Sequence, residues 1–309
     1  MSKAITLTYL VKASAANVNA SHTEGNVQTI KRVTLPDGSV LPYISGQAVR
    51  RMLRDRLEDI GWQLSEPFAK VSGQEVTPPA KPDQYIDEDL FGYMDASGGK
   101  RRTSPTRVST LVGLFPYWGD RDLGTRSFER FTGTPAEGGN MFETELTDCL
   151  YRGTILVELD RVGVFPAREL GKGASDSQLP LEERRRRVQA LVQALSLLWG
   201  GGRTARMLTD LSPQFIAYAR LKVKTPLFLE AVQIEYQPGR RYMLQTEPIR
   251  HAIERLPAEW RETVLFGYTP GFFANESSLR QELTGVGEVK TIAELIPTIL
   301  KDIEEGLRE

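Results

Sequence analysis

Small polar side chains and positive charge gather near the start of the chain, in the stretch NASHTEGNVQTIKRV over residues 19–33. Asparagine amides can hydrogen-bond the oxygens of a phosphate or a sugar, and neighbouring cations add electrostatic attraction to such a contact. The residues that could act in this way are Asn17, Asn19, Asn26, Lys31 and Arg32. Their types and spacing predict a surface that binds a phosphate-rich ligand.

The stretch YISGQAVRRMLRDRLEDIGW predicts a helix with Ser45 as its amino-terminal cap. Free N–H groups and the helix dipole favour an anion at that end, whereas cations there oppose the dipole. The polar side near this end carries Gln47, Arg50, Arg51 and Arg54, and these residues together with Ser45 are candidate contacts to a phosphate-rich ligand. A solvated face with Asp55 and Glu58 as partners is the alternative. The cations at the helix start favour a bound phosphate.

Two further stretches combine basic residues with glycine. In GGKRRTSPTR, at 98–107, the cations are Lys100, Arg101, Arg102 and Arg107. They could contact phosphate, and a solvent-exposed surface that binds no ligand is equally consistent with this composition. In WGGGRTAR, at 199–206, one glycine would suffice to cap a helix, so close approach of backbone to a ligand is the hypothesis for Gly201, Gly202 and Arg203. A mobile linker is the alternative there.

The sequence holds no recognisable catalytic or metal-binding arrangement. Cys149 is the single cysteine and the two histidines, His22 and His251, lie far apart, which excludes an internal disulfide and disfavours a zinc site. The acidic run at 87–89 could hold magnesium, but such a run more often begins a helix. With 39 basic and 40 acidic residues, the net charge of −1 gives no overall attraction to nucleic acid. We therefore expect no enzyme, no cofactor and no metal.

Hydrophobic periodicity predicts an α+β fold. Strands are indicated at 5–11, 107–116, 153–165 and 214–223, and helices after Ser45 and at 188–199. The rest is interpreted as an insertion that lies over the core at 62–106, a protruding hairpin at 119–147 and a mostly helical tail at 240–309. Without the insertions the order is β-α-β-β-α-β, the ferredoxin-like topology. The basic run at 184–187 is interpreted as solvated or intersubunit surface.

The opening segment alternates like a strand, with Ile5, Leu7, Tyr9 and Val11 on one face, and is broken by threonines and Lys12. This pattern distinguishes it from a signal peptide. No stretch approaches the length of a membrane span. We expect a cytoplasmic protein without a membrane partner.

Six stretches, in the same order, resemble the DevR group of CRISPR-associated proteins, which supplies the repeated backbone subunit of type I Cascade surveillance complexes. They are NVNASHTEGNVQTIKRV, YISGQAVRRMLRD, DLFGYM, SPTRVS, GNMFETELT and GRTARMLTDLSP, and the resemblance runs from about residue 5 to residue 220. It implies a modified RNA-recognition-motif palm with inserted fingers, by position 62–106, and a β-hairpin thumb, by position 119–147.

The resemblance also implies the partners. Copies of such a subunit form a helical filament along a guide RNA, grip its sugar–phosphate backbone and leave the bases free to pair with target DNA. The other Cascade subunits are one that binds the five-prime handle of the guide, a large subunit and a guide-processing endonuclease. The thumb displaces a base at regular intervals, a role that by position falls to Phe128, Phe131, Met141 and Phe142. Antiviral defence and RNA-guided transposition both remain open.

Related type III subunits cut target RNA with an aspartate in the loop after the first strand. Here that loop offers His22, Glu24 and Asn26, with no aspartate before Asp37. We therefore expect no cleavage. The chief rival hypothesis is a metal-dependent ribonuclease of the type III kind, with Glu24 or Asp37 as a ligand. A small-molecule enzyme on a ferredoxin-like scaffold would need a pocket-forming motif that the sequence lacks.

Overall fold

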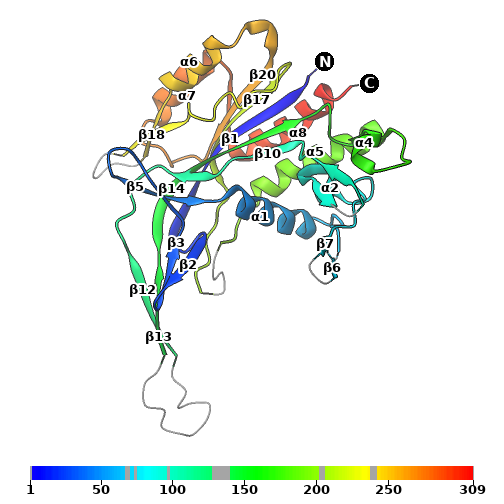
Figure 1. Ribbon diagram of the computed structural model, residues 1–309. Helices are drawn as coiled ribbons and strands as arrows, with labels where there is room; N and C mark the ends of the chain where they lie inside the picture. Colours follow the sequence, from blue (N-terminus) through cyan, green and yellow to red (C-terminus); the bar gives the residue numbers. More distant parts are fainter. Residues whose placement is uncertain are drawn as a thin grey trace.

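A nine-stranded sheet forms the centre of the described part of the molecule (Figure 1). The computed structural model describes residues 2–66, 70–72, 75–95, 98–126, 140–201, 206–236 and 242–308. The strands lie in the order β21-β20-β17-β1-β14-β11-β5-β4, and β10 also pairs with β14. Their bounds are β1 (Ala4–Ala16), β4 (Arg32–Thr34), β5 (Val40–Ile44), β10 (Thr106–Val108), β11 (Leu111–Gly113), β14 (Thr147–Glu158), β17 (Pro213–Leu221), β20 (Arg261–Tyr268) and β21 (Glu288–Thr291).

Helices cover both faces of this sheet, which explains why β1 is buried along most of its length. Ile5, Leu7 and Tyr9 lie in a core shared with α1, α5 and α8. Leu10, on the opposite face, lies in a second core shared with α6 and α7. Alternate residues of a strand face opposite sides, so both sets need a covered face. The helices are α1 (Gly46–Asp59), α5 (Leu181–Ser196), α6 (Glu247–Arg255), α7 (Glu276–Thr284) and α8 (Ile292–Gly306).

The elements β1, α1, β11, β14, α5 and β17 follow one another in the predicted β-α-β-β-α-β succession. In the sheet, β1 lies between β14 and β17 and is antiparallel to both, with Leu7 opposite Ile155 on one side and Tyr218 on the other. The fold class is α+β. The tail differs in part from the prediction, because β20 and β21 extend the sheet beyond β17.

The ends of the two central helices bear on the functional argument. The Ser45 hydroxyl accepts a hydrogen bond from the Ala48 N–H, which makes Ser45 the cap that the sequence predicts for α1. Helix α5, by contrast, ends at Ser196, and its last N–H capping bonds come from Leu197. Gly200 and Gly201 therefore do not cap this helix, and their presence needs a different explanation.

A four-stranded sheet lies beside the central one, in the order β12-β13-β3-β2. Its strands are β2 (Ala20–Glu24), β3 (Val27–Ile30), β12 (Arg121–Arg126) and β13 (Asn140–Glu145). The connection after the first strand is therefore a hairpin rather than an open loop, with its turn at Gly25, where φ is +59°. Strands β12 and β13 form an antiparallel pair that extends away from the central sheet (Figure 1).

The segment 62–106 contains two short hairpins and a helix: β6 (Lys70–Ser72), β7 (Glu75–Thr77), α2 (Ile86–Phe91), β8 (Tyr93–Asp95) and β9 (Lys100–Arg102). The prediction that this whole segment lies over the core is wrong for α2. Ile86, Leu90 and Phe91 are buried in the same core as α1 and α5. The prolines around this helix hide its short apolar pattern.

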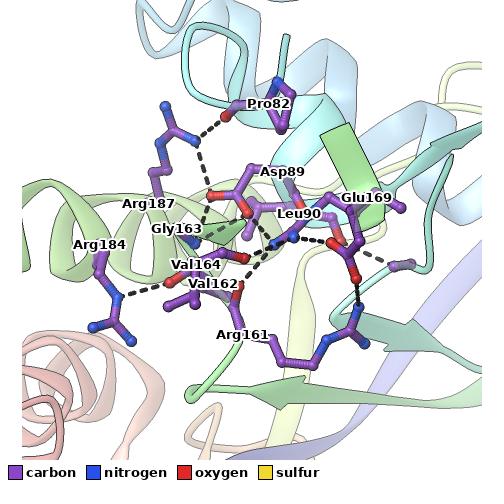
Figure 2. Close-up of polar contacts among 12 residues, drawn as sticks. Pro82, Asp89, Leu90, Arg161, Val162, Gly163, Val164, Glu169, Arg184 and Arg187 are labelled. Atoms are coloured by element: carbon purple, nitrogen blue, oxygen red, sulfur yellow. Dashed lines mark hydrogen bonds and ion pairs between the residues drawn. The ribbon is translucent and has the colours of Figure 1, made fainter. Parts of the chain in front are cut away.

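Asp89 of α2 is the centre of a buried network of ion pairs (Figure 2). Its carboxylate lies 2.6 Å from Nη2 of Arg102 and 2.8 Å from Nη1 of Arg187, and it accepts the Gly163 N–H. Arg184 is also buried and donates to the Val162 carbonyl. The interpretation of 184–187 as solvated surface is therefore wrong for Arg184 and Arg187.

The remaining described elements are β15 (Val164–Phe165), α4 (Ala167–Leu170), β16 (Ser177–Gln178), β18 (Gln233–Tyr236), β19 (Tyr242–Gln245) and a 3-10 turn at Ala258–Trp260. Within the described ranges, no helix is long and apolar enough to cross a membrane.

Candidate nucleic-acid interface

A cavity of about 410 Å³ lies where the end of β1, helix α1 and the segment after α5 meet. We term it the glycine cavity. It is lined by residues 18–20, Ala48, Arg51, Met52, Asp55, Arg56 and residues 199–201. Spacings of three and four place 48, 51, 52 and 55 on one side of the helix. Two stretches that the sequence identified separately, the polar start of the chain and the glycine run, thus meet in space.

Gly200 and Gly201 form the bare wall of the glycine cavity. Their φ angles are +143° and +119°, a conformation that residues with a side chain rarely adopt. A Cβ on Gly201 would lie 3.1 Å from the Val18 Cα, and one on Gly200 would lie 3.0 Å from the Met52 Cγ. Backbone conformation and close packing both require glycine here. Gly202 and Arg203, predicted together with Gly201, lie outside the described residues.

Charge and an aromatic surface stand on the other side of the cavity. Arg51 is exposed and pairs with Asp55 at 2.9 Å. Arg56 donates to the Trp199 carbonyl at 3.1 Å, and its guanidinium lies 4.2 Å from the centre of the Trp199 ring. Trp199 is 40% exposed. The sequence predicts Trp199 as the last residue of the helix at 188–199 and does not identify it as a cavity residue, although the glycines directly after it are a signal for one.

Three predicted contacts use their side chains within the protein. Asn19 Oδ1 accepts the Ser45 N–H at 2.9 Å, and the Ser45 hydroxyl caps α1. Asn17 is buried and donates to the Glu145 carbonyl at 3.0 Å, while its Oδ1 has no hydrogen-bond partner among the described residues. These side chains join the start of β2, helix α1 and β13. Their structural role is to shape the edge of the cavity.

The remaining polar residues of the first two stretches are more accessible. Asn26 is exposed at the β2–β3 turn, and Gln47 is exposed in the first turn of α1. Lys31 is half-buried and makes no ion pair with any residue in the described ranges. Arg32 lies 3.4 Å from Glu145 Oε1 and over the Tyr117 ring. These four residues keep the donors that the prediction requires.

Two predicted arginines are enclosed by the protein. The Arg102 side chain is 0% exposed and pairs with Asp89 and Glu169, each at 2.6 Å, so the prediction of an RNA contact is wrong for Arg102 in this conformation. Arg54 lies 3.5 Å from Asp87 and over the Phe91 ring, and its side chain is 13% exposed. Burial lowers the pKa of Arg54, although Asp87 opposes this effect. Arg54 therefore attaches α1 to α2.

Arg50, Arg101 and Arg107 form a second basic area on a different side of α1. Arg101 is exposed on β9, and Arg107 on β10 pairs with Glu158 at 2.7 Å. Burial lowers the pKa of Arg50, and repulsion from Arg107 lowers it further. Two guanidinium groups that repel one another identify a place where a bound anion would be stabilising.

The two predicted thumb residues that the structure describes, Met141 and Phe142, differ in their environments. Met141 is 59% exposed on β13. The neighbouring Phe142 ring lies against Gly124 of β12, where a Cβ would be 2.3 Å from the ring, and the Arg206 guanidinium lies 4.7 Å from the ring centre. Phe128 and Phe131 lie outside the described residues.

The two carboxylates that the rival hypothesis offers as alternative metal ligands, Glu24 and Asp37, are not among the residues that line the glycine cavity. Glu24 Oε1 lies 2.8 Å from Nε2 of His22 at the exposed β2–β3 hairpin. Asp37 accepts hydrogen bonds from the N–H and the hydroxyl of Ser39, and these hydrogen bonds lower its pKa. Both carboxylates have ordinary local partners.

Comparison with known proteins identifies the family. The model of the family "CRISPR-associated negative auto-regulator DevR/Csa2" matches residues 80–235. A protein described as "CRISPR-associated protein Cas7/Cst2/DevR" of Myxococcus xanthus (strain DK1622) is 26% identical in an alignment of 251 positions, and the match covers 73% of this chain and 74% of that protein.

Two solved structures share the fold. A chain of a "CRISPR RNA-guided surveillance complex, pre-nicking" superposes with a TM-score of 0.62 and 14% identity, over 97% of this chain and all of the other. A chain of a "CRISPR RNA-guided surveillance complex" gives a TM-score of 0.58 and 18% identity, over 97% of this chain and 99% of the other. The likeness thus covers nearly the whole α+β fold. With the family match over half of its length, the chain belongs to the DevR/Csa2 family of CRISPR-associated proteins.

Proposed function

We propose that this protein is the repeated backbone subunit of a Cascade-type surveillance complex in the cytoplasm. It binds a guide RNA by the sugar–phosphate backbone, independently of base sequence, and leaves the bases free to pair with a target DNA strand. Copies of the chain associate along the guide, together with the other subunits of the complex. The resulting complex serves antiviral defence or RNA-guided transposition.

The glycine cavity is the observation that carries this proposal. It combines backbone bared by Gly200 and Gly201, an exposed cation at Arg51 and the half-exposed ring of Trp199. A guide carries a different sequence in every complex, so its carrier must bind phosphates, sugars and stacking faces, which all nucleotides share. The cavity offers groups of these kinds.

The architecture supports the assignment of parts. The β-α-β-β-α-β core would be the palm, residues 62–106 the fingers, and β12 with β13 the base of the thumb. Family membership and the likeness to chains of RNA-guided complexes favour this division. In the proposed filament the exposed Met141, with Phe128, Phe131 and Phe142, reaches the neighbouring copy and the nucleic acid.

We further propose that the chain binds without cutting. The first two carboxylates after the first strand in sequence are engaged locally, Glu24 with His22 and Asp37 with Ser39. Incubating the assembled complex with complementary RNA and magnesium tests this proposal. Cleavage at regular intervals, abolished in a Glu24→Gln or an Asp37→Asn variant, would establish the ribonuclease instead.

The binding proposal is tested with the double variant Lys31→Glu, Arg51→Glu. Both residues are accessible, and each reversal replaces attraction to phosphate by repulsion. A charge-assisted hydrogen bond contributes about 1.5–3 kcal/mol, so RNA affinity should fall by at least about 3 kcal/mol. Fluorescence anisotropy with two unrelated RNA sequences over a range of salt concentrations measures the effect. Wild-type affinity should depend steeply on salt and little on sequence.

The matched control is Arg250→Glu, Lys301→Glu, which changes the charge equally at two exposed positions outside the lining of the cavity. It should bind RNA nearly as the wild type does. If both variants lose the same RNA affinity, the loss is an effect of net charge alone. If the Lys31→Glu, Arg51→Glu variant binds RNA as the wild type does, the glycine cavity is not part of the RNA interface.

A further inference from the structure

A second cavity, of about 520 Å³, has four arginines among its six lining residues. We term it the arginine pocket; its lining is Arg101, Thr103, Arg107, Arg161, Arg168 and Glu169. These residues come from β9, from β10 and the segment between them, from the turn after β14, and from α4. The fold thus brings four guanidinium groups from separate parts of the chain to one concave site.

The floor of the pocket is fixed by the buried ion-pair network (Figure 2). Arg161 donates to the Thr103 carbonyl at 2.7 Å and lies 3.2 Å from Glu169. Glu169 in turn pairs with the buried Arg102, which Asp89 holds from the other side. Arg161 is therefore held in position before any ligand arrives, which reduces the ordering cost of binding.

The rim carries cations that the described protein does not neutralise. Arg101 and Arg168 are both exposed, and neither forms an ion pair with a residue in the described ranges. The carboxylates at the pocket are shared with other cations, since Glu169 also pairs with Arg102 and Glu158 also pairs with Lys224. Positive charge therefore exceeds negative charge at this site.

Arg50 adds to the imbalance from the side of α1. It is half-buried beside Arg107, and its Nε has no hydrogen-bond partner among the described side chains and backbone. Burial lowers the pKa of Arg50, with repulsion from Arg107 as the second cause. A donor that is partly removed from water and faces a second cation gains an acceptor when an anion binds between the two groups.

We propose that the arginine pocket is a phosphate-binding site for a nucleic-acid backbone, separate from the glycine cavity. Guanidinium forks match phosphate oxygens in bidentate geometry, and the Thr103 side chain adds a hydroxyl. The α1 residues 48, 51, 52 and 55 face the glycine cavity, whereas Arg50 lies on another side of the helix, so the two sites flank α1. This inference rests on the proposed function and extends it to a second contact.

The test compares the wild-type full chain with Arg101→Ala, Arg168→Ala, in which both rim cations are removed and the floor is kept. Fluorescence anisotropy measures binding of a labelled single-stranded RNA, and separately of the same RNA paired with complementary DNA, at several salt concentrations. We expect Kd to rise at least about tenfold. The slope of log Kd against log salt should fall by about 0.7 for each phosphate of a single strand that the variant no longer neutralises.

The control variant is Arg250→Ala, Arg255→Ala on α6, an equal change of charge outside both sites. If the rim variant, unlike the control, loses affinity for single-stranded RNA, the bound phosphate belongs to the guide. If it loses affinity only for the RNA–DNA hybrid, the bound phosphate belongs to the paired strand. Either result supports the proposal that the arginine pocket binds phosphate. A variant that binds both probes as the control does overturns it.

The two proposals fail in different ways. If the wild type binds RNA, is weakened by the Lys31, Arg51 reversal and is unaffected at Arg101 and Arg168, the arginine pocket alone is refuted. If the wild type binds neither probe at any salt concentration, the proposed function and the pocket both fail. Thermal melting of the rim variant should match the wild type, since both side chains are exposed; the charge-retaining Arg101→Lys, Arg168→Lys serves as the second variant and should bind with intermediate affinity.

Discussion

At the scale of single residues, neighbours in sequence have opposite roles. Lys100, Arg101 and Arg102 look like one basic cluster, yet they form β9, where successive side chains point to opposite sides. Arg101 is exposed at the rim of the arginine pocket, whereas Arg102 is buried against Asp89 and Glu169. Composition alone cannot distinguish an arginine that contacts phosphate from one in a buried ion pair. Once the strand is known, the alternation of its side chains between the two faces makes this distinction.

The Asp89 network yields a stability prediction for single residues. Asp89→Asn leaves Arg102 and Arg187 buried without their shared carboxylate, and breaking a buried pair in this way costs about 3–5 kcal/mol. Urea unfolding at pH 7 should show this loss. Arg101→Ala, one residue from the network but exposed, should stay within about 0.5 kcal/mol of the wild type. A cost for Asp89→Asn as small as that would show that water or rearrangement compensates the two arginines.

At the scale of elements, the sequence predicts the segments whose apolar residues recur at a regular spacing and misses segments without such a pattern. Strand β1, the cap of α1 and the apolar stripe of α5 follow from spacing. Strand β20 shows no alternation of apolar and polar residues. Its neighbours Leu265 and Phe266 are both apolar, because they point to opposite faces of the sheet and each packs in a different core. Helix α2 is too short for a clear stripe and lies among prolines. The β2–β3 hairpin has a turn signal at Gly25 but little apolar content.

The candidate site was partly predictable for the same reasons. Asn26, Lys31 and Gln47 are accessible, as their polar surroundings suggest, while Asn17 and Asn19 bond within the protein. Arg161 and Arg168 of the arginine pocket could not be found from sequence, because they are far from the other basic stretches and only the fold brings them to Arg101. A local sequence pattern does not show which residues far apart in the chain come into contact in the fold.

The glycine segment gives a prediction at this scale. Gly201→Ala places a Cβ at φ +119° and 3.1 Å from the Val18 backbone, so it should destabilise the fold by about 1–3 kcal/mol and lower RNA affinity by displacing the cavity wall. Gly285→Ala is the matched control: φ is −68°, and the nearest atom to a new Cβ is 3.6 Å away. Thermal melting and RNA anisotropy on both variants measure the difference. Identical behaviour would show that residue 201 needs no glycine.

At the scale of the whole molecule, a net charge of −1 is compatible with a polyanionic partner because charges are sorted by location. Arg102 and Arg187 neutralise carboxylates inside the protein, whereas Lys31, Arg101 and Arg168 meet no carboxylate in the described part. Local excess at two sites can therefore bind phosphate without an overall basic surface. In the proposed filament, acidic surface elsewhere on the protein could face a neighbouring copy.

The last prediction concerns assembly, and it separates a subunit of a filament from a self-sufficient monomer. Replacing residues 127–139 by a short Gly-Ser turn keeps the pairing of β12 with β13, from Arg121 opposite Glu145 to Arg126 opposite Asn140, and the contact of β13 with β3. If the apolar residues of this hairpin act on a neighbouring copy, the variant should melt within a few degrees of the wild type and still bind RNA. It should no longer form particles of regular size on a long guide, as measured by size-exclusion chromatography with RNA.

The control is a Gly-Ser replacement of residues 237–239, between the paired strands β18 and β19. It tests whether replacing any connection between two paired strands impairs assembly, and this variant should assemble normally. A truncated protein that melts well below the wild type would mean that the hairpin packs on its own domain, because its apolar side chains would then support the fold of the monomer. Normal assembly by the truncated protein would assign the contact between copies to another surface, such as the exposed Trp118 at the base of β12. The three outcomes differ in two independent measurements, so stability and assembly can be attributed to the hairpin separately.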